Sequence, residues 1–527
     1  MMSVLSTLFI NAQPWKVFAI AFLLGALGTL AFEPFSWFFM AFFSLSGLLW
    51  LLNNSQSTSW KHVFAIGWWF GLGHFTTGLY WIAFAMSIDL QQFGWLIPFA
   101  LLGLPAVLSF FIAPVTLLTH MSRTKGLTQL FYFSMLWAIF EWLRGHVLTG
   151  LPWNLIGYIW MDYDLMNQSL SLFGAYGLSL ITVFIAGLPF LSLETTSLRN
   201  RIFYSSIALI LLISLGTFGK WRLFYANDGV LPNICLRLVQ PNIPQRLKWD
   251  HKHLNKNFEH LLFLTSSPAQ KPITHILWPE AAVPCLLEYD HGKRHRVASV
   301  IPSEGALMTG GVRLIKRSRV NIQAWNSIFV ITPDAQITDI YDKSHLVPFG
   351  EYVPMRSFFP SFVKKVTAGS TDFSSGTGPR TLKVKGLPPF SPLVCYEGIF
   401  PGEVKEKQGE RPQWIYNATN DAWFGPTSGP YQHLAINRAR AIEEGLPYIR
   451  VANTGISAVI DAYGRVKASL PLNTEGTIDT ELPLPSSSLT LYSLYGDRIF
   501  FGLLVFFSLL FLGGFLSHRR CAKRTVK

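Results

Sequence analysis

Three residues of this 527-residue chain have the types that acyl transfer through a thioester requires: Glu280, Lys343 and Cys395. A cysteine thiol has a reference pKa of about 8.5, so at neutral pH it needs a base or a positive neighbour before it attacks a carbonyl. A glutamate can be that base, and a lysine ammonium can stabilise the charge that develops on the carbonyl oxygen. Each residue alone is more often structural or solvated than catalytic. Their local contexts favour the catalytic interpretation.

Each of the three residues closely follows an apolar, β-rich run. Glu280 follows residues 276–278, Lys343 follows 337–341 and Cys395 follows 393–394. The C-terminal edges of strands line the ligand crevice of open α/β sheets, so we expect the three side chains to converge. Strands are predicted at 234–239, 274–278, 327–332, 392–395, 414–418, 449–452 and 458–460, and a helix at 431–444 that ends at Gly445. This pattern is typical of a layered α/β domain.

The composition indicates a membrane protein that carries this domain. Half of the residues are hydrophobic, and the chain holds 43 Phe and 18 Trp, more than a soluble globule would readily bury. The formal charge of +13 does not indicate a nucleic-acid partner, because the basic residues are scattered or lie beside apolar runs.

Apolar runs predict about eight membrane helices, since each approaches the roughly 20 residues that a bilayer core requires. They lie at 17–32, 35–52, 63–86, 93–118, 127–143, 170–193, 202–218 and 499–516. We therefore expect a membrane domain of about seven helices at 1–219, a catalytic domain at 220–490, and a last helix with a basic tail at 491–527. The first helix is expected to stay uncleaved, because Pro14 and Lys16 form only a late, weak basic region.

The charged connectors predict the orientation of the chain, because Lys and Arg near span ends are retained in the cytoplasm. One side carries Lys16, Lys61, Arg123, Lys125, Arg199 and Arg201, joined by the basic tail. The opposite side carries Glu33, Asp89, Asp162 and Asp164, with Arg144 as its main basic exception. The domain at 220–490 is therefore expected outside the cytoplasm. Arg144 is expected to pair with Glu141.

Several ordered motifs resemble the nitrilase, or carbon–nitrogen hydrolase, superfamily. They are Trp-Pro-Glu at 278–280, Tyr-Asp-Lys-Ser-His-Leu-Val-Pro-Phe-Gly-Glu-Tyr-Val-Pro at 341–354, Cys-Tyr-Glu at 395–397, and the segments 417–425, 440–443 and 453–457. The membrane-spanning flanks, Gln-Pro-Asn-Ile-Pro-Gln at 240–245 and Glu-Trp-Leu-Arg-Gly at 141–145 are similar to one branch of it, the apolipoprotein N-acyltransferase family.

The resemblance implies a polytopic α-helical membrane domain joined to an αββα sandwich that faces the periplasm from a bacterial inner membrane. It implies that Cys395 is the nucleophile, Glu280 the general base and Lys343 the group that stabilises the transition state. The acyl chain would come from a phospholipid, typically phosphatidylethanolamine. It would pass to the α-amino group of the N-terminal diacylglyceryl-cysteine of an apolipoprotein. Supporting positions carried over from the motifs are Trp249, Glu351, Tyr396 and Glu397.

Two rival functions stay open at this point. A membrane-tethered amidase or nitrilase would use the same three residues but admit water as the second substrate. A transporter or receptor could use an inactive domain of this fold, although ionisable residues inside the helices are scarce.

No metal or other cofactor is expected. His251, His253 and His260 lack the spacing of a zinc site, and the chain has no P-loop, GxSxG or dinucleotide fingerprint. The cysteines lack CxxC spacing, so we expect Cys235 and Cys285 to be free buried thiols, although an oxidising exterior would permit their pairing.

The segment around 358–365 could meet the lipid headgroups. Phe358, Phe359 and Phe362 lie beside Lys364 and Lys365, and apolar anchors with basic partners are typical of an interfacial flap. Ordinary loop packing is the alternative.

Overall fold

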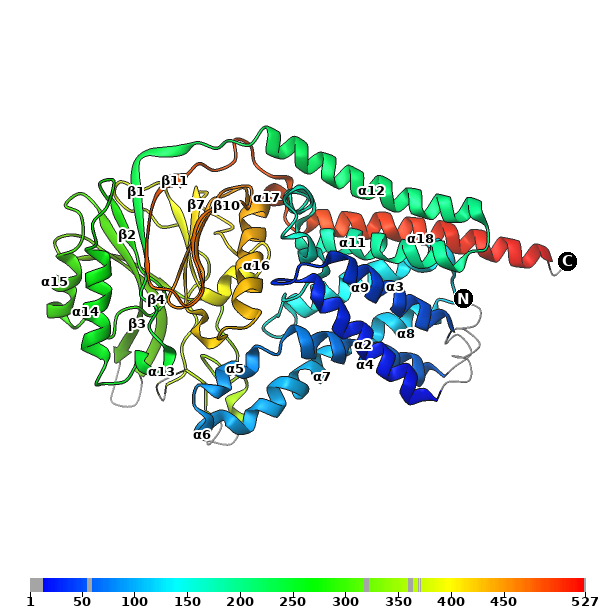
Figure 1. Ribbon diagram of the computed structural model, residues 1–527, viewed down its shortest axis with the longest axis horizontal. Coiled ribbons are helices and arrows are strands. Elements are labelled where there is room, and N and C mark those ends of the chain that lie inside the picture. The colour runs from blue at the N-terminus through cyan, green and yellow to red at the C-terminus, as the bar shows by residue number, and fades with distance from the viewer. Residues whose placement is uncertain are drawn as a thin grey trace. The chain divides into compact units, whose positions relative to one another are not determined.

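The computed structural model describes residues 13–54, 59–316, 322–358, 364–367, 369 and 371–525. The chain divides into two compact units (Figure 1). One is helical and comprises residues 1–83, 96–225 and 490–527. The other comprises residues 84–95 and 226–489 and contains the sheets.

The predicted apolar runs correspond to helices. The main ones are α2 (Pro14–Gly28), α3 (Phe38–Asn54), α4 (Trp60–Gly78), α8 (Ala113–Met121), α9 (Gly126–His146), α11 (Leu170–Glu194), α12 (Leu198–Phe224) and α18 (Arg498–Thr525). Short helices are α5 (Ile82–Ser87), α6 (Leu90–Phe93), α7 (Leu104–Leu108), α10 (Asp164–Asn167) and α17 (Leu491–Tyr495). Among the described residues, five segments are long and apolar enough to cross a membrane: Pro14–Ala31, Leu90–Met121, Leu170–Glu194, Leu198–Phe224 and Arg498–Ser517.

Two of the predicted helices are divided. The run at 63–86 forms α4, which ends at Gly78, and the separate helix α5. The run at 93–118 is broken into short helical pieces, and Pro98, Pro105 and Pro114 lie at or next to the start of successive pieces. Proline is accommodated in the first turn of a helix because the backbone N–H it lacks would have no intrahelical acceptor there.

Among the described residues, the expected direct ion pair between Glu141 and Arg144 does not form, although the two charges act on each other. Glu141 Oε1 instead accepts hydrogen bonds from Trp137 Nε1 at 3.0 Å and from the Ile156 N–H at 2.9 Å. Arg144 donates to the carbonyl oxygens of Leu151 and Trp153 at 2.6 and 2.7 Å. Both charged side chains therefore bind the backbone that follows α9.

The second unit contains two sheets (Figure 1). The six-stranded sheet has the order β11-β1-β2-β3-β4-β5, and the five-stranded sheet has the order β10-β9-β8-β7-β6. The strands of the first are β1 (Val230–Gln240), β2 (His275–Leu277), β3 (Ala306–Lys316), β4 (Ile322–Ile331), β5 (Ile337–Asp342) and β11 (Gly476–Pro483). Those of the second are β6 (Phe390–Val394), β7 (Trp414–Thr419), β8 (Tyr448–Ala452), β9 (Ser457–Ile460) and β10 (Val466–Leu470).

Apolar side chains from both sheets form one core between them, and helices cover the outer faces. The inner core contains Leu277 and Met308 from the first sheet, with Tyr416 and Val451 from the second. Helices α14 (Leu254–Thr265) and α15 (His291–Ala298) share a second cluster with the outer face of the first sheet. Helix α16 (Gly429–Glu444) packs in the same way on the second sheet. The predicted αββα sandwich is confirmed.

Three strands were not predicted. Strand β3 contains Gly310-Gly311, and paired glycines inside a strand argue against one when the sequence is considered alone. Strand β10 has no buried residue, and β11 is partly polar, so neither shows the apolar run of an inner strand. The paired first and last parts of the domain, β1 and β11, are antiparallel.

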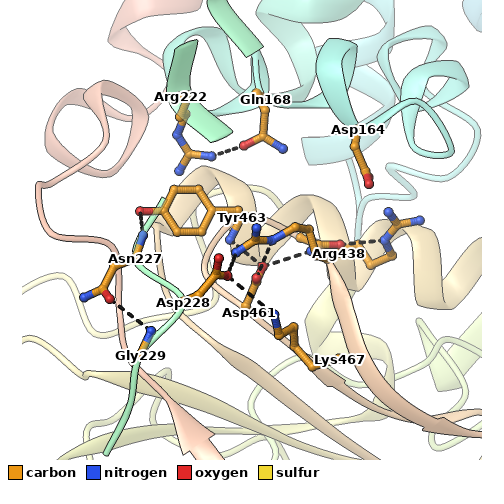
Figure 2. A network of polar contacts seen from close by, with 12 residues as sticks. Asp164, Gln168, Arg222, Asn227, Asp228, Gly229, Arg438, Asp461, Tyr463 and Lys467 are labelled. Carbon is orange, nitrogen blue, oxygen red and sulfur yellow. Dashed lines mark hydrogen bonds and ion pairs between the residues drawn. The ribbon is translucent and has the colours of Figure 1, made fainter. Parts of the chain in front are cut away.

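Polar contacts fasten the segment that enters β1 to the turn between β9 and β10. Asp228 forms ion pairs with Arg465 and with Lys467, the latter at 3.4 Å (Figure 2). The Asn227 N–H donates to the Tyr463 hydroxyl at 3.1 Å. Asp461 Oδ2 accepts from Arg465 Nε at 2.6 Å. These contacts attach the segment before β1 of the first sheet to the second sheet.

The end of α16 provides a test of the local fold. Gly445 caps this helix in the left-handed conformation, with φ 65°. A Cβ in that conformation costs roughly 1–2 kcal/mol, and asparagine tolerates it better than alanine does. We expect Gly445→Ala to lower the thermal midpoint of the full-length protein in detergent by several degrees, and Gly445→Asn to lower it less. Equal midpoints for the two variants would contradict this account.

Candidate active site

Glu280 lies three residues beyond β2 and is 8% exposed. Its Oε1 accepts a hydrogen bond from Asn326 Nδ2 at 2.7 Å. Its Oε2 has no hydrogen-bond partner among the residues that the structure describes. The second oxygen is therefore available to accept a proton from a neighbouring group.

The backbone around Glu280 passes unusually close to Gly310 of β3. A Cβ at position 310 would lie 2.6 Å from the Glu280 Cα and 2.5 Å from the Ala281 nitrogen. The Gly310 carbonyl accepts from the Ala282 N–H at 2.9 Å, and its N–H donates to the Pro279 carbonyl at 3.2 Å. Glycine is therefore needed at 310 to place Glu280, a role that only this close approach reveals.

Lys343 directly follows β5 and is 1% exposed. Its Nζ lies 2.9 Å from Glu351 Oε2, which also accepts from the Val347 N–H at 2.8 Å. Glu351 Oε1 accepts from Asn326 Nδ2 at 3.0 Å. One amide group thus joins both carboxylates, and the Lys343 N–H also donates to the Asn326 carbonyl at 2.8 Å. Sequence reasoning missed Asn326, which belongs to none of the motifs.

Cys395 directly follows β6 and opens a short 3₁₀ turn, Cys395–Ile399. Its φ is 52°, in the left-handed region that residues with a side chain rarely adopt. Such a conformation persists only where surrounding contacts maintain it, and strained residues of this kind cluster at active sites. The Asn417 side chain donates to the Cys395 carbonyl at 3.3 Å. The thiol is 7% exposed, as a recessed nucleophile should be.

Glu397 holds the turn after Cys395 against the segment after Lys343. Its Oε2 accepts from the Val394 N–H at 2.7 Å. Its Oε1 accepts from the Tyr341 hydroxyl at 2.8 Å and from the Ser344 N–H at 2.7 Å. One buried carboxylate therefore joins the segment that carries Cys395 to the segment that follows Lys343.

The three predicted residues influence one another electrostatically. Burial raises the pKa of the Cys395 thiol, and the Glu280 charge raises it further, while the Lys343 ammonium lowers it. Burial raises the pKa of Glu280 more than Lys343 lowers it. Burial opposes the charge of Lys343, but Glu351 and Glu280 together raise its pKa above the ordinary value. The thiol therefore stays protonated at rest, beside a carboxylate able to accept its proton and a lysine that remains charged.

The other two supporting residues lie differently. Tyr396 is partly buried, its ring lies 5.1 Å from that of Phe400, and the Lys343 ammonium acts on its hydroxyl. Trp249 follows α13 (Gln245–Lys248) and is partly buried. The structure gives Trp249 no hydrogen bond or ring contact with another described residue. Its predicted role in substrate binding stays a prediction.

A buried ionic cluster that sequence reasoning did not identify lies behind the nucleophile. Asp421 pairs with Arg450 and with His433 Nδ1, the latter at 2.9 Å. Despite its burial, the Arg450 charge lowers the pKa of Asp421 to about 2. Cys395 Sγ, an Asp421 oxygen and a His433 nitrogen lie within 4.8 Å of one another, a spacing that could hold a metal ion. Both oxygens of Asp421 are already engaged, Oδ1 by His433 and Oδ2 by Arg450, so the described contacts suit a structural role.

The remaining expectations have mixed outcomes. Cys235 and Cys285 are free thiols, the first buried and the second partly exposed. Phe358 of the expected flap is 81% exposed, whereas Phe359 and Phe362 lie outside the described residues. Lys365 is buried, and its Nζ lies 4.2 Å from the centre of the Phe373 ring. Lys364 is exposed, so of the two lysines only Lys364 lies at the surface, and the interfacial flap stays a prediction.

Two family models match the chain. Residues 24–188 match the apolipoprotein N-acyltransferase N-terminal domain, and residues 235–490 match carbon–nitrogen hydrolase. Among solved structures, a carbon–nitrogen hydrolase superfamily protein from Xanthomonas campestris aligns with 52% of this chain and 97% of its own, at 19% identity and a TM-score of 0.35. An amidase from Nesterenkonia sp. aligns with 49% and 93%, at 19% identity and a TM-score of 0.34.

Relatives of higher identity cover nearly the whole chain. An apolipoprotein N-acyltransferase from Rhodopseudomonas palustris is 39% identical over 504 residues, 93% of each chain. One from Rickettsia typhi is 38% identical over 483 residues, 92% of this chain and 95% of its own. With both domains matched in order and the αββα sandwich present, this protein belongs to the apolipoprotein N-acyltransferase family.

Proposed function

We propose that this protein transfers a fatty acyl chain from a phospholipid, through a thioester on Cys395, to the α-amino group of an N-terminal diacylglyceryl-cysteine. The acceptor is an apolipoprotein, and the donor is phosphatidylethanolamine. The observation that carries the proposal is that Glu280, Lys343 and Cys395 each follow a strand and act on one another's pKa in a buried site. Apolar helices of membrane length in the same chain suit a lipid donor.

In the first half-reaction, Glu280 Oε2 takes the thiol proton while the sulfur attacks the ester carbonyl of the phospholipid. The charge on the carbonyl oxygen is stabilised by the Lys343 ammonium and by the backbone N–H that follows Cys395. The C–O bond then breaks, and Glu280 returns the proton to the departing alkoxide. The products are a lysophospholipid and the acyl-enzyme thioester.

In the second half-reaction, the amine of the lipid-modified cysteine attacks the thioester carbonyl. Glu280 takes a proton from the attacking nitrogen, the C–S bond breaks, and the same proton returns to the Cys395 sulfur. An amide is formed and the resting thiol is restored. Glu351 holds Lys343 by an ion pair, and Glu397 holds the segments next to Cys395 and Lys343 by hydrogen bonds. Tyr396 and Trp249 are assigned to substrate contact.

The hydrolase rival differs only in the second substrate. Water in place of the amine would release a free fatty acid from the same thioester. The family match favours the transferase, since the helical part of the chain also matches the N-acyltransferase family. The transporter or receptor rival is disfavoured by the assembled Glu280, Lys343 and Cys395.

We also propose a location in the bacterial inner membrane with the sandwich domain in the periplasm. The support is the excess of Lys and Arg on alternate connectors and in the tail.

The thioester provides the direct test of the proposed chemistry. Full-length protein incubated with phosphatidylethanolamine of defined chains should gain one acyl mass, and peptide mapping should place it on Cys395. Cys395→Ser should lose the thiol-linked, hydroxylamine-sensitive adduct, whereas Cys285→Ser should keep it because that thiol lies outside the site. Adding a diacylglyceryl peptide should discharge the adduct as N-acyl peptide. Free fatty acid without N-acyl peptide would instead establish the hydrolase.

Gly310 tests the placement of the base. A side chain at 310 must push the Glu280 backbone away, and a misplacement of about 1 Å can reduce a rate on the order of 100-fold. We expect Gly310→Ala to slow single-turnover acylation of Cys395 by about that factor. Gly292→Ala is the control, because a Cβ there meets its nearest neighbour, Asp290 Oδ1, at an ordinary 3.7 Å. Unchanged acylation by a folded Gly310→Ala protein would contradict the assigned role of Glu280.

Labelling of an introduced cysteine tests the orientation. Gln408 is exposed on the sandwich domain, so Gln408→Cys should react with a membrane-impermeant maleimide in cells whose outer membrane alone is permeabilised. The unmodified chain is the control, because its described thiols are buried or partly buried. Labelling that occurs only after the inner membrane is disrupted would place the domain in the cytoplasm.

A further inference from the structure

A second buried lysine approaches the site from an element that carries none of the three central residues. Lys248 is the last residue of α13, in the connection between β1 and α14, and is 6% exposed. Its Nζ donates a hydrogen bond to the Glu280 carbonyl at 2.9 Å. A buried ammonium is stable only with acceptors or opposite charges close by, so its environment should indicate its role.

The contacts of Lys248 bear on both the backbone and the charge of Glu280. Lys248 binds the carbonyl of Glu280. The next residue, Ala281, has a left-handed backbone conformation with φ 46°. Gly310 constrains the same peptide from the other side. Lys248 therefore holds the main chain from which the Glu280 carboxylate projects.

The charged groups around the Cys395 thiol leave the Glu280 carboxylate without a directly paired cation among the described residues. Glu280 and Glu351 supply two carboxylates, and the Lys343 ammonium forms its 2.9 Å ion pair with Glu351. The carboxylate of Glu280 accepts only from the neutral Asn326 amide among the described residues. Asp421 is already matched by Arg450. Lys248 is the second ammonium whose charge acts on both Glu280 and Cys395.

We propose that Lys248 is a positioning residue for the acyl transfer, which anchors the Glu280 backbone and adds a second positive charge, beside that of Lys343, that favours the ionised Glu280 carboxylate. Its bond is to a carbonyl within the protein, so it acts through Glu280 and not on the substrate. The inference rests on the proposed acyl-enzyme chemistry, and it adds a residue that no family motif used above contains.

The charge of Lys248 should affect the acid limb of the pH profile. Burial lowers the pKa of Lys248 to about 8, even though Glu280 and Cys395 both favour its charged form. The charged groups that also act on Glu280 are Lys343 and Glu351. Below a pH of about 8 the Lys248 ammonium is charged and lowers the Glu280 pKa, so it favours the ionised base where the rate depends on that base.

The test is the pH profile of single-turnover acylation of Cys395 by phosphatidylethanolamine, measured by intact mass on the full chain in lipid–detergent micelles. In Lys248→Met the acid limb should move to higher pH, since the Glu280 pKa rises without its neighbour. A shift of about one pH unit would lower the rate on that limb about tenfold. Lys248→Arg should keep the acid limb where it is in the unmodified protein, because arginine retains the positive charge.

Arg246→Met is the matched control, because Arg246 belongs to the same short helix but is exposed, and its profile should overlay that of the unmodified protein. Two results would overturn the inference: a Lys248→Met profile parallel to the unmodified one, whatever its height, or a Lys248→Arg acid limb shifted as far as that of Lys248→Met. If Lys248→Met does not fold, Lys248→Gln takes its place, because it also removes the charge. An unmodified protein that forms no adduct at any pH would instead refute the proposed function.

Discussion

Ionised groups in this site are removed from water, and the rest of its arrangement follows from that constraint. Glu280, Lys343 and Glu351 are all less than one-tenth exposed. A buried charge is costly unless opposite charges and hydrogen bonds replace the lost solvent. Glu351 therefore pairs with Lys343, and Asn326 donates to both carboxylates. The same burial raises the pKa of the Cys395 thiol, which keeps its proton on the sulfur at rest.

The backbone provides the positions that this electrostatic balance needs. Residues just beyond β2, β5 and β6 carry the three central side chains, and the two sheets that bear them share one apolar core. Two of these three positions depend on a residue with a left-handed backbone conformation. These residues are Cys395 itself and Ala281, which follows Glu280. Gly310 leaves room for the backbone at Ala281, because it has no side chain. Glu397 binds the backbone next to Cys395 and the segment after β5. Strain at the site is thus maintained by contacts from several strands.

A lipid substrate gives this enclosure its purpose in the proposed reaction. A thioester exposed to solvent would lose its acyl chain to water before an amine arrived. A recessed thiol, 7% exposed, limits that loss. The apolar helices provide a surrounding in which the acyl donor is already concentrated. A soluble amidase needs no such helices, because water or a small amide reaches its thiol from solution.

The sequence by itself determined the class of fold, and it singled out three candidate residues that the structure places in buried positions beyond strand ends. The predicted strands all lie within or overlap observed ones, because an inner strand must be apolar whatever its neighbours are. Glu280, Lys343 and Cys395 could be proposed from the sequence because their residue types and strand-end positions are local properties. Strand β3, Gly310, Asn326 and Lys248 were not found, and the pair expected between Glu141 and Arg144 does not form. Only the tertiary structure decided these, because close backbone approach and the balance of buried charge depend on segments far apart in the chain.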